Sequence, residues 1–310
     1  MTPYIYFGSD AFSRSVLEGL LKVSPPLAVV TQPDRPAGRK QQLRSGPLAL
    51  LAKENALPLI QPEHLKDSGT QDEILSIGAK LLIVVSFGQI IPRSFLEQCP
   101  PIINGHASLL PKYRGASPIQ SSILNGDDIT GMTIMHIVPP LDAGPMISKE
   151  HVQIDSHDNH GSLSVKLIES SIRLLLPYIE GEEVPKGEDQ DDSISTHCSK
   201  LNTTDAQLLP LEHNSATLSN IIRAFSPVPG AHLFIESTKG PKRLKILKAT
   251  PSEYSITEQP GLSREGKKEL FLTGRDGQSL RVEEVQPEGK GAMPIAAFLN
   301  GIQGDLQLSP

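Results

Sequence analysis

Residues 80–92 read KLLIVVSFGQIIP, and their pattern indicates the class of fold most directly. Residues 81–85 are apolar at every position rather than at alternate positions, which is typical of a parallel strand covered by helices on both faces. A turn-forming SFG sequence follows directly. We therefore place a central strand here and expect the loop after it to lie at the edge of a sheet.

Strand-like and helix-like segments alternate on both sides of this stretch. Alternation of this kind predicts a mostly parallel sheet of the α/β class. The expected strands are residues 4–7, 27–31, 57–60, 102–104 and 132–138, and the expected helices are residues 11–22, 47–55 and 71–77. A longer amphipathic helix begins near Leu163, and Pro177 should end or bend it.

The composition changes after this helix. Residues 180–192 are acidic and almost without apolar spacing, which is typical of a solvated connection. Ser215 can cap a helix that runs to Phe225, and short alternating runs follow at residues 232–236, 243–248, 270–273 and 280–285. Several short antiparallel strands predict a small all-β barrel. We expect a domain at residues 1–189, a linker at 190–205 and a second domain at 206–310.

Composition and charge exclude several classes of protein. The chain has 310 residues, of which 38% are hydrophobic, so it can bury a core. No apolar run approaches the roughly 20 residues of a membrane helix, and the first ten residues lack a basic leader, so we expect a cytoplasmic protein without a membrane partner. The net charge of −6 argues against nucleic-acid binding through the whole surface. Two cysteines form no disulfide framework.

Three polar side chains follow predicted strands. Asn104 and His106 are two residues apart at a strand exit, so they share one face if the chain stays extended, and Asp142 lies in a later loop. A carboxamide, an imidazole and a carboxylate suit acyl transfer, because they can donate to an oxyanion and move a proton. Each residue also has a structural explanation as a turn former, a satisfied histidine or a loop cap.

The sequence motifs around these three residues resemble those of a known protein family. Asn104 begins NGHASLLPKYRGASPIQ, and LDAGPM surrounds Asp142. Further matching stretches are TQPDRPAGR at 31–39, VVSFGQIIP at 84–92, GMTIM at 131–135 and IRAFSPVPGA at 222–231. The chain resembles the methionyl-tRNA formyltransferase family over nearly its whole length. The N-x-H, SLLP and Asp set is shared with other 10-formyltetrahydrofolate enzymes, whereas the loop at 31–39 and the IRAF segment are typical of the tRNA member.

The resemblance implies a Rossmann-like formyltransferase domain followed by a C-terminal barrel like an OB-fold. It implies formyl transfer from 10-formyltetrahydrofolate to the α-amine of methionyl initiator tRNA, in support of translation initiation. It places Asn104, His106 and Asp142 in the catalytic triad. Residues matching the folate-binding stretch are Ser108, Leu109, Leu110 and Pro111, with Phe87 and Gly88 near the pterin.

Two basic groups are the candidate tRNA contacts. One lies in the loop that the family uses to approach the acceptor end, and the other lies on a strand of the second domain. Their members are Arg35, Arg39, Lys40 and Arg44 in the loop, and Lys239, Lys242, Arg243, Lys245 and Lys248 within residues 239–248. Both groups could also be ordinary solvated surface. We expect a monomer.

Two departures from the family pattern stand out. Position 105 usually carries a larger apolar residue, and Gly105 gives the backbone between Asn104 and His106 more freedom. The tryptophans common in the linker and in the IRAF segment are missing, and Val228 takes the place of the second. The alternatives are formyl transfer to a small amine such as an amino-sugar nucleotide, a catalytically inactive RNA- or folate-binding module, and a second domain that merely dimerises.

Other ligand signals are weak. Gly8 follows the first strand without a G-x-G-x-x-G pattern, so we expect no nicotinamide or ATP. The residues His151, Asp155, His157, Asp158 and His160 cluster before a helix, but their spacing matches no ligand set, and we expect no metal.

Overall fold

The structure is a computed structural model that describes residues 1–37, 41–237, 240–253, 259–302 and 306–309. The chain divides into two compact units. The first contains residues Met1–Pro118, Ile129–Gln153 and Ser164–Cys198, and the second contains Ile119–Asp128, Ile154–Leu163 and Ser199–Pro310. Among the helices of these described ranges, none has the length and apolar character needed to span a bilayer.

A seven-stranded sheet forms the centre of the first unit, in the order β10-β9-β7-β6-β1-β2-β5. Strand β9 pairs antiparallel with both of its neighbours, β10 and β7. All neighbouring strands from β7 to β5 in this order pair in parallel. The strands are β1 (Tyr4–Phe7), β2 (Ala28–Val30), β5 (Leu59–Ile60), β6 (Leu81–Val84), β7 (Ile102–His106), β9 (Ile129–His136) and β10 (Met146–Gln153).

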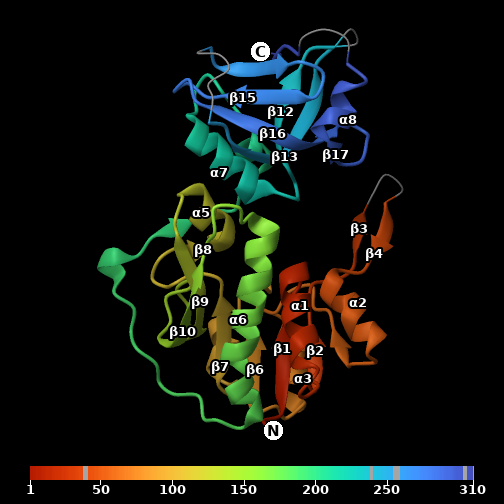
Figure 1. The fold of residues 1–310 in the computed structure, drawn as a ribbon. Helices are drawn as coiled ribbons and strands as arrows, with labels where there is room; N and C mark the ends of the chain where they lie inside the picture. Colours follow the sequence, from red (N-terminus) through yellow and green to blue (C-terminus); the bar gives the residue numbers. More distant parts are fainter. Residues whose placement is uncertain (38–40, 238–239, 254–258, 303–305, 310) are drawn as a thin grey trace. The chain divides into compact units, whose positions relative to one another are not determined.

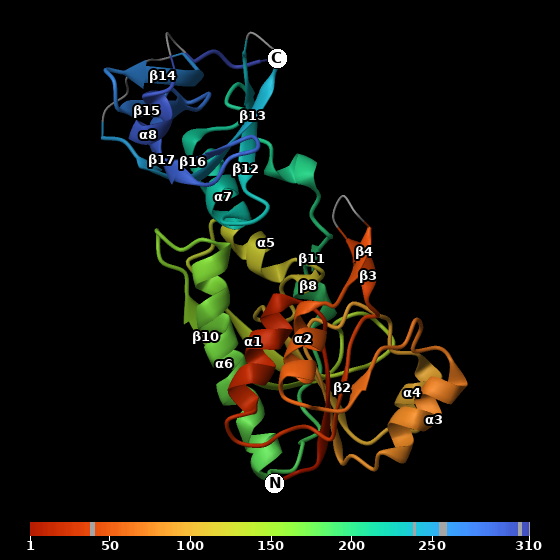
Figure 2. The same cartoon turned by 90° about the vertical axis from the view of Figure 1, so that its right-hand side faces the viewer.

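Helices cover both faces of this sheet, as the all-apolar central strand predicts. One layer holds α1 (Ala11–Leu20), α2 (Pro47–Glu54) and α6 (His160–Glu180), whose apolar residues pack on Tyr4 and Tyr6 of β1. The other layer holds α3 (Ser68–Ser76) and α4 (Arg93–Leu96), which pack on Ile5 and Phe7. Figure 2 shows α3 and α4 on the side of the sheet away from α6. Successive β1 residues point to opposite faces, so one strand serves two cores.

The sequence interpretation left open whether Pro177 ends or bends its helix, and it missed several strands. Helix α6 does not end at Pro177 but continues to Glu180, because a proline in the last turn removes only one hydrogen bond and the Pro177 carbonyl accepts from Gly181 N–H at 3.1 Å. Strand β10 was not predicted. Neither was the hairpin of β3 (Arg35–Ala37) and β4 (Gln42–Arg44).

The second unit contains a curled antiparallel sheet in the order β12-β13-β16-β15-β14, with β17 paired to β16. Its elements are α5 (Pro118–Leu124), α7 (Ser215–Phe225), β12 (Ala231–Ile235), β13 (Lys242–Pro251), β14 (Gly261–Glu265), β15 (Glu269–Thr273), β16 (Ser279–Pro287), β17 (Met293–Pro294) and α8 (Ile295–Leu299). The predicted fold class, a Rossmann-like domain followed by a small all-β barrel, is confirmed.

The cap of α7 differs from the prediction by one residue. Asn214, not Ser215, is the N-cap, because its side-chain oxygen accepts the backbone N–H of Thr217 at 2.8 Å. Ser215 is the first helical residue, and its hydroxyl donates to Asp276 in the turn between β15 and β16. The start of the helix is therefore tied to the turn that joins β15 and β16.

Candidate active site

Strand β7 presents two of the three predicted catalytic side chains. Asn104 is half-buried and His106 is 6% exposed, and alternation along the strand puts both on one face. Gly105 lies between them and points to the other face, where an added Cβ would be 3.4 Å from the hydroxyl of Ser171. Gly105 is opposite Ile134 in the β7–β9 ladder, so strand pairing holds the backbone between the two side chains in the extended conformation.

One ring nitrogen of His106 is fixed by the main chain. The Nε2 atom lies 2.8 Å from the carbonyl oxygen of Tyr113. A carbonyl can only accept, so Nε2 carries a proton and donates it there. The other ring nitrogen, Nδ1, is then the atom of His106 that faces the rest of the site.

The loop of Asp142 brings a carboxylate to that second nitrogen. Oδ2 of Asp142 lies 3.7 Å from Nδ1 of His106, and the two side chains are 12% and 7% exposed. The same oxygen accepts the backbone N–H of Gly115 at 2.9 Å. The structure therefore brings His106 and Asp142 together in a largely dehydrated place, where charge interactions are stronger than in water.

The route of this loop was not predictable from the strand order. β9 runs antiparallel to β7, with His136 at its end opposite Ile103, so the chain leaves β9 at the amino end of β7. The loop then folds back to reach His106, and Asp142 adopts a left-handed backbone with φ of 51°. Short polar residues such as aspartate tolerate this conformation better than most.

A turn between His106 and Tyr113 holds the predicted folate-binding stretch. The Ser108 side chain is fully buried and donates to the Lys112 carbonyl, and Leu110 packs in a small core with Met135. The Thr133 hydroxyl donates to the Ser108 carbonyl at 2.7 Å and accepts from the Leu110 N–H at 3.2 Å. Ser108 and Leu110 therefore shape the turn, whereas Leu109 and Pro111 remain half-buried.

The loop after β6 contains the other two predicted folate-binding residues, Phe87 and Gly88, of which one is buried and one is exposed. Phe87 is 3% exposed and packs edge-on against Phe7, with 5.4 Å between ring centroids. Its carbonyl accepts hydrogen bonds from Ser9 at 2.7 Å and from Gln32 at 3.0 Å. Gly88 is exposed and has a φ of 75°, which favours glycine. Phe87 is thus part of the core, and Gly88 is the accessible residue.

The first basic group lies on the β3–β4 hairpin. Arg35 and Arg44 are directly opposite each other in the ladder and are exposed, and Arg35 forms an ion pair with Glu63 at 2.8 Å. Arg39 and Lys40 lie outside the described residues. Asp34 closes the base of the hairpin, because its carboxylate accepts from Gln61 and Ser45, at 2.7 Å each. These hydrogen bonds, that of Gln61 first, lower the pKa of Asp34.

The second basic group lies on β13, where alternation sorts the side chains as predicted. Leu244 and Ile246 are fully buried, whereas Arg243 and Lys245 are partly exposed on the opposite face. Lys248 is paired with Glu283 at 2.7 Å, and Lys239 lies outside the described residues.

An aromatic residue that the sequence interpretation missed shares this face. Phe234 of β12 is directly opposite Arg243 and is 36% exposed, and His232 is opposite Lys245. Burial first, and then the charges of Arg243 and Lys245, lower the pKa of His232. The alternation of residues 232–236 could have revealed Phe234, because it makes every second side chain of that strand an outward one.

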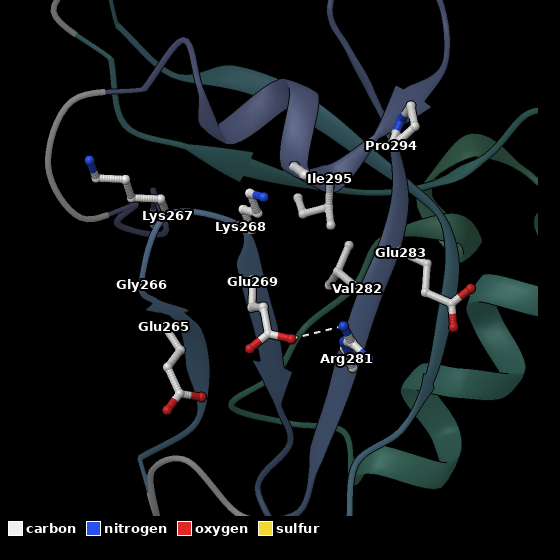
Figure 3. Close-up of a pocket in the computed structure, with 11 residues that line it drawn as sticks. Glu265, Gly266, Lys267, Lys268, Glu269, Arg281, Val282, Glu283, Pro294 and Ile295 are labelled. Atoms are coloured by element: carbon white, nitrogen blue, oxygen red, sulfur yellow. Dashed lines mark ion pairs between the residues drawn. The ribbon is translucent and has the colours of Figure 1, made fainter.

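Two hollows in the second unit differ in charge. A hollow of about 90 Å³ beside Arg243 and Lys245 also has Lys290 and Glu288 in its wall. A wider hollow of about 730 Å³, shown in Figure 3, has Lys267 and Lys268 beside carboxylates, and its Arg281 is paired with Glu269 at 2.8 Å. The cations of the wider hollow are balanced by acids, whereas those on the β13 face outnumber the acids there. The lining carboxylates of the wider hollow are Glu265, Glu269 and Glu283.

The candidate metal cluster before α6 is occupied by its own hydrogen bonds. The side chains of Asp155, His157 and Asp158 bring potential ligand atoms within 4.8 Å of one another. However, the two carboxylate oxygens of Asp158 accept from Asp155 N–H at 2.9 Å and from the Ser162 hydroxyl at 2.7 Å. Asp158 thus ties the turn before α6 to Ser162 in the first turn of the helix, whereas the helix is capped by Asn159, whose side-chain oxygen accepts the Ser162 N–H at 3.0 Å.

Comparison with protein families gives two matches that together span most of the chain. The family described as formyl transferase matches residues 6–178, and the formyl transferase C-terminal domain matches residues 202–303. Among curated proteins, the chain is 39% identical to a methionyl-tRNA formyltransferase of Streptococcus pneumoniae, over 97% of this chain and 96% of that protein. It is 36% identical to one of Staphylococcus epidermidis, over 99% and 98% respectively.

Solved structures share the fold at lower identity. A sugar 3N-formyl transferase, WlaRD, superposes with a TM-score of 0.63 at 19% identity, over 94% of this chain and 99% of that one. HypX from Aquifex aeolicus, in complex with tetrahydrofolic acid, gives a TM-score of 0.65 at 14% identity, over 100% of this chain and 51% of that one. These likenesses concern the fold of the polypeptide.

Proposed function

The chain belongs to the methionyl-tRNA formyltransferase family, and from that premise we propose that Asn104, His106 and Asp142 perform its reaction. The enzyme transfers a formyl group from 10-formyltetrahydrofolate to the α-amine of methionine carried by initiator tRNA. The single observation that supports these three roles best is the contact between His106 and Asp142. It joins side chains from two distant segments of the chain, which are 7% and 12% exposed.

The roles follow from where charge develops. The amine attacks the formyl carbon, so negative charge appears on the formyl oxygen and the amine must lose a proton. When the oxyanion collapses, the bond from the formyl carbon to N10 of the folate breaks, and N10 leaves with the proton that the amine gave up. The Asn104 carboxamide donates to that oxygen, and His106 donates through Nδ1, since its Nε2 proton is directed to Tyr113. Asp142 stabilises the charged imidazole through Oδ2, and its other oxygen, Oδ1, accepts the proton of the amine.

We propose that the folate contacts come from accessible residues and main chain. Gly88 is exposed, and Leu109 and Pro111 are half-buried near the turn that follows His106. Ile90 and Leu141 are 77% and 70% exposed, which leaves apolar side chains uncovered close in sequence to Gly88 and Asp142. An aromatic heterocycle suits such a surface, because it covers apolar groups and reaches main-chain polar groups at its rim. Phe87, Ser108 and Leu110 then act by holding these segments in shape.

We also propose that tRNA is bound by the β3–β4 hairpin and by the β13 face. The hairpin presents Arg35 and Arg44, and Arg39 and Lys40 belong to its connecting residues. The β13 face combines the cations Arg243 and Lys245 with an exposed phenyl ring, which is the composition that contacts phosphates and stacks on bases. Lys242 lies at the start of the same strand, and Lys248 contributes less because it is paired with Glu283.

Each of the two matched families supports a separate role for its part of the chain. We propose catalysis by residues 1–189, a connection at 190–205 and tRNA contact by residues 206–310. In the structure, residues 190–198 lie with the first unit, and the acid-rich part of the connection begins before them. The connection therefore has a first half that packs on the catalytic unit.

One assay tests the function and its alternatives together. Purified protein with 10-formyltetrahydrofolate is offered charged initiator tRNA, charged elongator tRNA, free methionine or an amino-sugar nucleotide. Formylation confined to initiator tRNA is the expected result. Formylation of the sugar would support the small-amine alternative, and no formylation of any acceptor would support an inactive binding module.

A further inference from the structure

Residues 188–198, here called the return segment, pass beside both catalytic loops of the first unit. Glu188 exchanges two backbone hydrogen bonds with Met146, at 2.7 and 2.8 Å, where the loop of Asp142 ends. Thr196 accepts from Tyr113 N–H at 2.8 Å through its hydroxyl, next to the carbonyl that binds His106. A segment expected to be a solvated connection therefore contacts the supports of both catalytic side chains.

Gln190 makes the central contact of this segment. Its Nε2 atom donates to the carbonyl of Asp142 at 2.8 Å and to the carbonyl of Gly144 at 2.8 Å. One amide group thus spans the turn in which Asp142 has a positive φ. Gly144 cannot be replaced without disturbing this turn, because an added Cβ would lie 1.8 Å from the carbonyl oxygen of His136.

Arg114 fixes the orientation of that amide. Its Nε donates to Oε1 of Gln190 at 3.0 Å, so the NH₂ group must face the two carbonyls. Arg114 is 6% exposed, and its Nη2 is also bound to Asp192 at 2.7 Å. Its chain neighbours are Tyr113, which accepts from His106, and Gly115, which donates to Asp142.

We infer that Gln190 is a positioning residue for formyl transfer, which holds the Asp142 loop so that the carboxylate stays beside Nδ1 of His106. Arg114 acts with it by orienting the amide. The inference rests on the proposed role of Asp142. It gives the buried arginine and the return segment a function in turnover in addition to one in folding.

Substitution of Gln190 by two residues of similar size tests this role. Gln190→Met removes all of its hydrogen bonds, and Gln190→Glu keeps an acceptor for Arg114 but loses both donors to the loop. We expect kcat to fall about 10- to 100-fold in both, because a displacement of about 1 Å at a reacting group can cost 10²-fold. The KM for charged tRNA should stay within about twofold, since Gln190 lies outside the β3–β4 hairpin and the β13 face.

The controls separate positioning from folding. Gln98→Glu makes the same chemical change in an exposed glutamine whose side chain donates to the Ser94 carbonyl of α4 at 2.8 Å, and it should leave kcat unchanged. Thermal unfolding of Gln190→Glu should resemble the parent protein, because Arg114 gains a charged partner. The acidic limb of the pH profile of kcat/KM should move in the Gln190 variants, which a purely structural role would not cause.

Asp142→Asn serves as the reference variant. If it is inactive and both Gln190 variants turn over at the parent rate, the inference is wrong and the proposed function stands. If Asp142→Asn turns over normally, the proposed function fails and the inference fails with it. A loss of kcat in Gln190→Glu that is matched by a lower melting temperature and an unmoved pH profile would also overturn the positioning role.

Discussion

The carbonyl oxygen of Tyr113 lies 2.8 Å from Nε2 of His106, and this one contact sets what the imidazole can do. Because the carbonyl accepts a hydrogen bond from Nε2–H, only Nδ1 can serve the reacting groups, and Nδ1 is the nitrogen beside Asp142. The Tyr113 carbonyl and the Asp142 carboxylate together fix which ring nitrogen of His106 faces the reacting groups. The carboxamide of Asn104, two residues earlier on the same face of β7, completes the set.

Removal of the Asn104 carboxamide should slow turnover without unfolding the protein. Loss of one oxyanion donor typically lowers kcat about 10²- to 10³-fold. We expect a loss of this size in Asn104→Ala, with KM values nearly unchanged, in a steady-state formylation assay. Asn55→Ala, which removes a carboxamide at the end of α2, is the matched control. Turnover in Asn104→Ala within threefold of the parent would contradict the donor role.

A methyl group at Gly115 should impair both activity and stability. Gly115 has a φ of 124°, and an added Cβ would be 2.1 Å from the carbonyl of Cys198, the partner of Gly115 in the β8 (Arg114–Gly115) and β11 (His197–Cys198) pairing. Strain of this kind costs on the order of 1–3 kcal/mol. Relief of this clash would also displace the Gly115 N–H, from which Asp142 accepts a hydrogen bond. Gly115→Ala should therefore melt at lower temperature and turn over more slowly.

The control for this substitution is Gly291→Ala. Gly291 is exposed and has no positive φ, and an added Cβ there would meet nothing within 4 Å among the described residues apart from its chain neighbours. It should behave like the parent protein in calorimetry and in formylation. Equal effects of the two substitutions would show that backbone geometry at Gly115 has no special importance.

Neutralisation of the β13 face should weaken the salt dependence of tRNA binding. Arg243→Gln with Lys245→Gln removes two partly exposed cations. If each contacts one phosphate, the slope of log K against log salt should flatten by about 0.9 per contact. Lys267→Gln with Lys268→Gln makes the same charge change beside the acid-lined hollow of Figure 3, and its slope should equal that of the parent. Filter binding over a salt series measures all three.

Disruption of the hairpin base should raise KM for tRNA selectively. Asp34 accepts from Gln61 through Oδ1 and from Ser45 through Oδ2, and an asparagine has only one such acceptor. We expect Asp34→Asn to raise KM for charged initiator tRNA several-fold while KM for folate stays constant. Asp72→Asn, on the exposed side of α3, supplies the control. An equal rise in both KM values would argue against a role of the hairpin in tRNA binding.

Stability of the second unit should depend on pH through His232. Its folded pKa lies below the ordinary value of 6.5, because burial and two neighbouring cations disfavour the charged ring. The unfolded chain therefore binds this proton more readily than the folded chain does. As a result, the contribution of His232 to the free energy of unfolding decreases as pH falls below about 6.5 and is constant above that pH. In His232→Gln this decrease should be smaller in denaturant titrations at pH 5 and 7.5. His64→Gln, at an exposed position, tests whether any histidine would do the same.

The periodicity of the apolar residues is sufficient to predict the main strands and which of their side chains are buried. Residues 81–85 indicated a strand buried on both faces, and the structure places helices over both, since burial follows side-chain type directly. The alternation in β13 likewise predicted which of its side chains point outward. The sequence motifs around Asn104 and Asp142 are specific enough to indicate the family without the tertiary structure.

The assembly of the site depends on contacts between distant segments, which the sequence does not reveal. The Tyr113 carbonyl and the Gly115 N–H are main-chain groups that every residue carries, so no side-chain pattern marks them. The antiparallel direction of β9, which forces the Asp142 loop to fold back, is a property of strand pairing between distant segments. Gln190 lies in an acidic stretch that looks like a linker, and only the folded chain brings its amide to the loop it supports.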